Sequence, residues 1–167
     1  IPLYGTHELG LGPAQVGLVM TASSAVDVVM FIPAGILMDR FGRKTASVPS
    51  FAVMAIGTAM IPLAHSFVTL MAVCLIIGAG NGLGSGSMMT LGADLAPAGA
   101  TGEFLGIWRL IGDAGGFLGP IVVGVMAGAF SLQGSAYALA LIGFAASLTL
   151  ALLVRETRVS PAVISTA

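Results

Sequence analysis

The stretch PAGILMDRFGRK, residues 33–44, decides the fold because it sets a tight charged turn between two long apolar segments. Four charged residues lie within six positions: Asp39, Arg40, Arg43 and Lys44. Such a cluster is costly inside a hydrocarbon layer, so the chain must reach the membrane surface here and turn back. Gly42 provides the permissive backbone that a tight turn needs. The stretch therefore predicts a hairpin of two membrane-spanning helices.

The composition also indicates a membrane protein. Of the 167 residues, 57% are hydrophobic and only 8% are charged, and the mean hydropathy is +1.05. Soluble domains carry about 25% charged residues, so a soluble chain of this composition could not cover its surface. The few basic residues argue against a nucleic-acid partner. Cys74 is the single cysteine, so we expect no intrachain disulfide, no metal site and no cofactor.

Five apolar segments are long enough to cross a hydrocarbon core of about 30 Å. The predicted fold class is therefore an all-α integral membrane protein, a polytopic helical bundle. The expected spans are residues 14–38, 45–64, 68–92, 104–129 and 135–154, within a bundle over 1–155 that is followed by a polar tail, 156–167. Pro33 should bend the first span, and Pro49 should lie in the first turn of the second, where its missing N–H costs little.

The basic residues predict the orientation, because cytoplasmic loops carry the Lys/Arg excess. The 39–44 turn is placed on the cytoplasmic side of the cell membrane, and counting spans puts the polar tail, with Arg155 and Arg158, on the same side. Residues 1–13, expected as a frayed apolar end and a loop, would then lie outside after an odd number of spans. We therefore expect a further span upstream, and Ile1 in place of Met indicates a fragment.

Three ionisable side chains lie inside the predicted spans, where each costs about 2.5–3.5 kcal/mol on insertion scales. Asp27 lies midway along the first span, and Arg109 and Asp113 lie four residues apart on one face of the fourth. We expect all three to face the bundle interior, a wet cavity or one another. Arg109 and Asp113 fit an intrahelical ion pair or a role in substrate binding, gating or coupling. Asp27 fits a substrate or proton site, or a structural partner of Arg109.

Two uncharged side chains complete the substrate candidates. Asn81 either lines a cavity or makes an interhelical hydrogen bond, and Trp108 is either a cavity wall or an interface anchor. Around Asn81, the stretch GAGNGLGSG, residues 78–86, has glycine at every second position. On a helix this spacing gives small-xxx-small pairs that let backbones approach closely. The stretch matches neither phosphate-loop pattern, G-x-x-x-x-G-K-[ST] or G-x-G-x-x-G.

Two motifs resemble those of major facilitator superfamily transporters. The family signature G-x-L-x-D-R-x-G-R-K is matched by Gly35, Asp39, Arg40, Gly42, Arg43 and Lys44. In the fourth span, the pattern G-x8-G-x3-G-P-x2-G-G is matched by Gly106, Gly115, Gly119, Pro120 and Gly124, with Val123 in place of one glycine. The second pattern is best known from the drug–proton antiporters of the family.

The resemblance implies a carrier of two six-helix halves. The first half of the family often carries an Arg in its fourth helix, and this chain has none near Gly78. The chain therefore resembles the C-terminal half and would hold helices eight to twelve and the end of helix seven. The signature would act as a latch, with Asp39 against a helix N-terminus or paired with a nearby Arg. The glycines of the fourth span would pack against other helices.

The implied function is secondary active transport of a small molecule by alternating access, coupled to an ion or proton gradient, with export favoured. The implied partners are the lipid bilayer, the substrate and the missing N-terminal half. The alternative is a membrane-embedded enzyme or a non-transporting scaffold. The chain contains no H-E-x-x-H or G-x-S-x-G motif and no His in a span that could activate Ser85, so we expect no enzyme.

Overall fold

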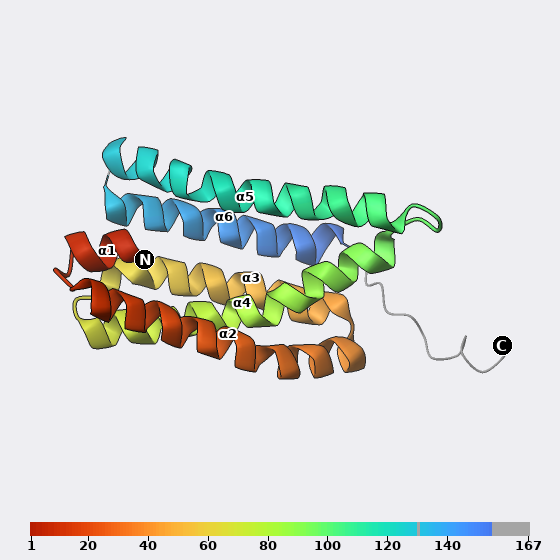
Figure 1. The fold of residues 1–167 in the computed structure, drawn as a ribbon, viewed down its shortest axis with the longest axis horizontal. Coiled ribbons are helices and arrows are strands. Elements are labelled where there is room, and N and C mark those ends of the chain that lie inside the picture. The colour runs from red at the N-terminus through yellow and green to blue at the C-terminus, as the bar shows by residue number, and fades with distance from the viewer. Residues whose placement is uncertain (130, 155–167) are drawn as a thin grey trace.

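The computed structural model describes residues 1–129 and 131–154, and within them the chain forms a bundle of long helices (Figure 1). Five helices in these ranges are long and apolar enough to cross a membrane. They are α2 (Pro13–Phe41), α3 (Arg43–Met60), α4 (Phe67–Leu95), α5 (Thr101–Ala129) and α6 (Leu132–Leu153). The short helix α1 (Pro2–His7) and the 3-10 turn η1 (Ile61–Leu63) accompany them. The all-α helical bundle predicted from the composition is confirmed.

The helices extend up to three residues beyond the apolar segments that predicted them. α2 continues to Phe41 and α4 to Leu95, three residues past the expected ends at 38 and 92. Polar residues at a membrane surface can remain helical, so hydropathy marks the hydrocarbon layer and not the end of the helix. One prediction was wrong: because α3 begins at Arg43, Pro49 lies inside the helix and not in its first turn. Another correction is α1, which occupies part of the expected N-terminal loop.

Gly42 alone separates α2 from α3. Its φ of 100° lies in the region that favours glycine, which confirms the turn predicted from the sequence. The Gly42 N–H donates to the Met38 carbonyl at 3.0 Å and closes the last turn of α2. A one-residue connection fixes α2 and α3 as antiparallel neighbours.

One face of α4 packs closely against α2. A Cβ added at Gly78 would collide with the backbone oxygen of Ser23, and one at Gly82 would collide with the backbone oxygen of Asp27. The Ser23 hydroxyl also donates to the Cys74 carbonyl on α4 at 2.7 Å. The two helices therefore meet backbone to backbone, as small residues permit in lipid.

The opposite face of α4 packs against α3. A Cβ at Gly80 would lie 2.9 Å from the Met54 backbone nitrogen, and one at Gly84 would collide with the Ser50 hydroxyl. That hydroxyl donates to the Gly80 carbonyl at 2.7 Å. Residues two apart on a helix point in nearly opposite directions, about 200° apart, so alternate glycines serve two partners. The glycine pairs predicted on this helix are confirmed.

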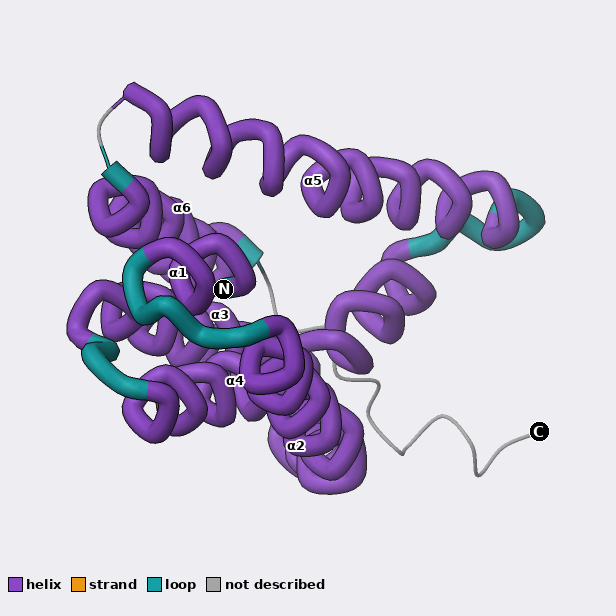
Figure 2. Tube along the Cα trace, turned by 60° about the vertical axis from the view of Figure 1, so that its left-hand side comes forward, coloured by secondary structure: helices purple, strands orange, loops and turns teal. Residues whose placement is uncertain are grey.

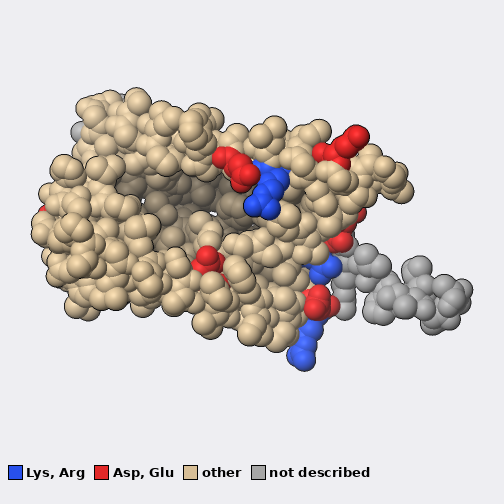
Figure 3. All heavy atoms as spheres, in the orientation of Figure 1, with Lys and Arg blue, Asp and Glu red and all other residues tan. Residues whose placement is uncertain are grey.

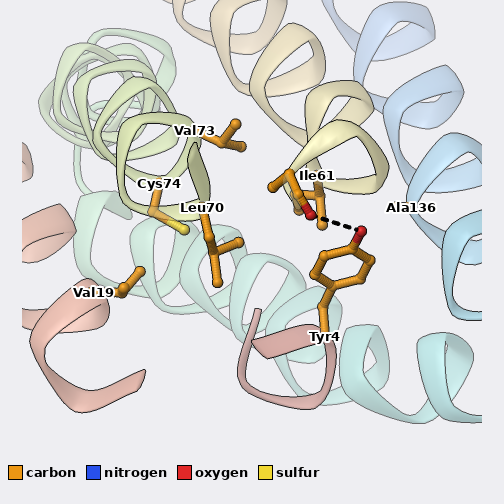
Figure 4. Close-up of a cluster of buried hydrophobic side chains, with 8 residues drawn as sticks. Tyr4, Val19, Ile61, Leu70, Val73, Cys74 and Ala136 are labelled. Atoms are coloured by element: carbon orange, nitrogen blue, oxygen red, sulfur yellow. Dashed lines mark hydrogen bonds between the residues drawn. The ribbon is translucent and has the colours of Figure 1, made fainter. Parts of the chain in front are cut away.

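A hydrophobic cluster closes the bundle at the α1 end (Figure 4). Tyr4 of α1 is buried there, and its hydroxyl lies 3.2 Å from the carbonyls of both Pro62 and Ala64. Leu70 and Val19 are fully buried beside it. The tyrosine therefore fastens α1 to the connection between α3 and α4.

Helix α5 runs along the outside of the bundle, beside α6 (Figure 2). None of its residues is buried. A Cβ added at Gly106, Gly115, Gly119 or Gly124 would meet nothing within 4 Å. A side chain at these positions would therefore meet no other helix among the described residues, and their helix-packing role stays a prediction.

The glycine contacts of α4 lead to a stability prediction. Replacing Gly78 with alanine should lower the free energy of unfolding by about 1–3 kcal/mol, because the added methyl group is forced against the α2 backbone. Unfolding in mixed detergent micelles, followed by circular dichroism, measures the change. Gly17→Ala is the matched control, since Gly17 lies on α2 in open space. Equal stability of the two variants would contradict the close α2–α4 contact.

Candidate functional site

The bundle is hollowed on the face between α2 and the α5–α6 pair (Figure 3). Acidic side chains lie over α2 and over α5, on either side of the hollow. At the α1 end a cavity of about 420 Å³ lies among α1, α5 and α6, and its lining includes Tyr4, Pro120 and Val123. A volume of this size is typical of a small-molecule site. Among the described residues, no group of three or more His, Cys, Asp or Glu could hold a metal ion.

Asp27 and Asn81 form a polar contact between α2 and α4. The Asn81 amide nitrogen donates to Asp27 Oδ2 at 3.0 Å. Asp27 Oδ1 is shielded from solvent and has no hydrogen-bond partner. The structure therefore pairs two candidates that lie 54 residues apart in the sequence. It pairs Asp27 with Asn81 and not with Arg109, and it gives Asn81 the interhelical hydrogen bond that was one of its two expected roles.

Arg109 and Asp113 form an ion pair within α5. The Arg109 Nε and Asp113 Oδ2 atoms are 3.7 Å apart, and the side chains are 70% and 73% exposed. An exposed pair of this kind contributes little to stability. Its position matters more, because a charged pair on an open helix face would lose free energy against the acyl chains of a membrane.

Trp108 joins α5 to α4. A Cβ added at Gly92 of α4 would lie 2.9 Å from Trp108 Nε1, so only glycine fits beneath the indole. The ring also stacks on Phe104, with centroids 6.0 Å apart. This arrangement gives Trp108 a role in helix packing, and its two predicted roles, a cavity wall and an anchor at the membrane–water interface, stay predictions. Sequence reasoning did not identify Gly92, because nothing near it in the sequence points to Trp108.

An ion-pair network lies at the turn between α2 and α3. Arg43 Nε donates to Asp94 Oδ2 of α4 at 3.2 Å, and Arg43 also pairs with Asp39 at 3.5 Å. The Arg43 and Asp94 side chains are only 21% and 19% exposed, whereas that of Asp39 is 80% exposed. Asp94 thus ties the end of α4 to the start of α3.

Of the other signature residues, Arg40 is exposed, and a Cβ added at Gly35 would meet nothing within 4 Å. Lys44 is partly exposed at the start of α3. The predicted inner tail, with Arg155 and Arg158, lies outside the described residues. The latch role of the signature therefore rests on the pairing of Asp39, Arg43 and Asp94.

The family model of the Major Facilitator Superfamily matches residues 1–166, almost the whole chain. The chain belongs to the major facilitator superfamily. It is therefore a multi-pass membrane protein of a transporter family, as the 35–44 signature indicated.

Two curated members of the superfamily are similar to this chain. The hexuronate transporter of Bacillus subtilis (strain 168) is 25% identical over 136 residues, which cover 81% of this chain and 32% of that protein. The quinolone resistance protein NorA of Staphylococcus aureus (strain Mu50 / ATCC 700699) is 27% identical over 127 residues, 76% of this chain and 32% of NorA. The chain thus spans about a third of the length of these superfamily relatives.

The superfamily signature leads to a second stability prediction. Asp94→Asn should lower the free energy of unfolding by about 1.5–3 kcal/mol, because the half-buried Arg43 loses a charged hydrogen-bond acceptor. Asp39→Asn should change it by about 0.5 kcal/mol or less, because that carboxylate is exposed. Unfolding in detergent at low ionic strength measures both changes in the free energy of unfolding. A larger loss for Asp39→Asn than for Asp94→Asn would reverse our assignment of the principal ion pair.

Proposed function

We propose that this chain is part of a secondary active transporter that moves a small molecule across the cell membrane by alternating access. Transport is coupled to an ion or proton gradient. The observation that carries the proposal is the Arg109–Asp113 ion pair, which is exposed on a helix that buries none of its own residues. In a membrane such a face must meet water or protein. A substrate crevice between the two halves of a carrier would bring both water and protein to this face of α5.

The partner in this proposal is the other half of the same carrier. The open sides of α2 and α5 flank the hollow, and large apolar side chains such as Ile32 and Phe117 are exposed on these two helices. Gly115 and Gly119 lie four residues apart on one face of α5, where an added Cβ would meet nothing within 4 Å, so this face would accept a helix closely. Rocking of the second half against this one would open the crevice to each side in turn.

The names of the two relatives support a small organic substrate. One is a hexuronate transporter and the other confers quinolone resistance, so the relatives handle a sugar acid and a drug class. Export is favoured by the Gly-Pro pattern that includes Gly119 and Pro120. In a carrier, the Arg109 guanidinium would bind or steer an anionic group of the substrate. We expect no enzymatic activity, and a non-transporting scaffold is the alternative that a transport assay excludes.

The orientation gives a prediction that needs no substrate. In a Cys74→Ala background, a cysteine at Thr45 should react with an impermeant maleimide only after the reagent reaches the cytoplasmic side. A cysteine at His65 should react from outside, because one span, α3, separates the two positions. Labelling of intact cells and of inside-out vesicles measures both. The reverse pattern would invert the proposed topology and place the basic turn outside.

The transport prediction uses the whole carrier, encoded by the complete reading frame, in proteoliposomes with hexuronate and a quinolone as probes. Arg109→Gln and Asp113→Asn should each lower gradient-driven transport about tenfold, a loss of about 1.4 kcal/mol of interaction. Glu103→Gln is the matched control, because Glu103 is an exposed carboxylate in the first turn of the same helix. Full activity in both ion-pair variants would remove the pair from the transport path. No gradient-driven flux of any tested solute would favour the scaffold.

A further inference from the structure

We infer that the substrate of this carrier is an anionic amphiphile, a molecule with a negatively charged head group and an apolar chain. Arg109 binds the head group, and the cavity among α1, α5 and α6 holds the chain. This inference rests on the proposed transport function and names the substrate class. It is carried by three features: the chemistry of the cavity lining, the exposure of Arg109, and the open face of α5 that joins the two.

The lining of the cavity suits an apolar group. Among the described residues that line this volume of about 420 Å³, most side chains are hydrocarbon and none is charged. The lining has three side-chain hydroxyl groups, and those of Tyr4, Thr58 and Ser135 already donate to backbone carbonyls at 3.2, 2.8 and 2.7 Å. A sugar acid in this cavity would lose hydrogen bonds to water and find none of these hydroxyl protons to replace them. An alkyl chain loses nothing there and gains free energy from the burial of its surface.

Arg109 offers an anionic group the charge that the cavity lacks. Its side chain is 70% exposed, and its Nε lies 3.7 Å from Asp113 Oδ2, a distance longer than a hydrogen bond. The guanidinium therefore keeps N–H donors for a second acceptor. A carboxylate, sulfonate or phosphate group fits these planar donors, and it would compete with the Asp113 carboxylate for them.

The charged group and the cavity lie on one face of α5. Pro120 and Val123, which line the cavity, follow Arg109 by eleven and fourteen residues. These spacings are close to three and four whole turns of about 3.6 residues, so the three side chains project to the same side of the helix. With a rise of about 1.5 Å per residue, Arg109 and Pro120 are about 16 Å apart along the helix axis. A ligand that reaches both must therefore be long, with its charge at one end.

The helix face between these two points is open. Gly112 and Gly116 lie between Arg109 and Pro120 on the same side of α5, and a Cβ added at either glycine would meet nothing within 4 Å. Because glycine has no side chain, this part of the helix offers a smooth surface along which a chain can lie. The strip thus changes from charged at Arg109, through bare backbone, to apolar at the cavity. An anionic amphiphile has its groups in the same order.

Binding of alkanesulfonates to the whole carrier in nanodiscs, with binding to empty nanodiscs subtracted, tests the inference. Dodecanesulfonate should bind about tenfold more tightly than butanesulfonate, because its longer chain is buried in the cavity. Val123→Trp, which fills the cavity, should remove this difference. The matched control, Val122→Trp, should keep it, because Val122 is exposed beside the cavity and does not line it. Arg109→Gln should weaken the binding of both sulfonates about tenfold. Equal affinities in the wild type, or an unchanged difference in Val123→Trp, would overturn the inference.

A photoreactive label locates the chain even where Val123→Trp does not fold. Dodecanesulfonate with a diazirine at the end of its chain should label the peptide that contains Leu139, in the cavity lining, and excess unmodified dodecanesulfonate should prevent this. Equal labelling by the matching neutral alcohol would show that the cavity takes any acyl chain, such as a lipid tail. No labelling would show that another part of the carrier fills the cavity. Either result would overturn the inference. Neither measurement uses a gradient, so the absence of gradient-driven flux would count against the proposed function alone.

Discussion

The close approach of α4 to two other helices is the constraint on which the rest of the structure depends. In lipid the hydrophobic effect does not press helices together, so association requires contact between surfaces that fit. Gly78 and Gly82 let α4 lie against the α2 backbone, and Gly80 and Gly84 do the same for α3. The resulting three-helix core carries α6 on the far side of α3 and leaves α5 attached mainly to α6. The result is a closely packed core of α2, α3 and α4, and a fifth helix, α5, that buries none of its own residues.

This division places the embedded charges in two different environments. Asp27 lies in the three-helix core, where its carboxyl group accepts a hydrogen bond from Asn81 and its backbone oxygen lies against Gly82. Arg109 and Asp113 lie on α5, where they pair with each other and face outward. The fold thus holds Asp27 at a contact between two helices and leaves the Arg109–Asp113 pair open to an ionic ligand or to a facing protein surface.

The charged turn joins the ends of the helices of this core. Arg43 bonds to Asp94 at the end of α4 and to Asp39 at the end of α2, so a single guanidinium links the ends of three helices. The connection at Gly42, one residue long, joins α2 directly to α3. The ion pairs of Arg43 and the close contact at Gly82 therefore both join α2 and α4.

The features that the sequence determined by itself are those that depend on neighbours along the chain. Apolar segment length predicted the five helices, Gly42 predicted the turn, and four-residue spacing predicted the Arg109–Asp113 pair and the glycine pairs of α4. The tertiary structure alone decided that Asp27 meets Asn81, that Arg43 meets Asp94 and that Trp108 rests on Gly92. These partners come from different helices, and α2 and α4 are apolar on nearly every side. Where a helix is apolar all round, hydropathy does not show which face is buried, so rotation and register are fixed only when the helices pack.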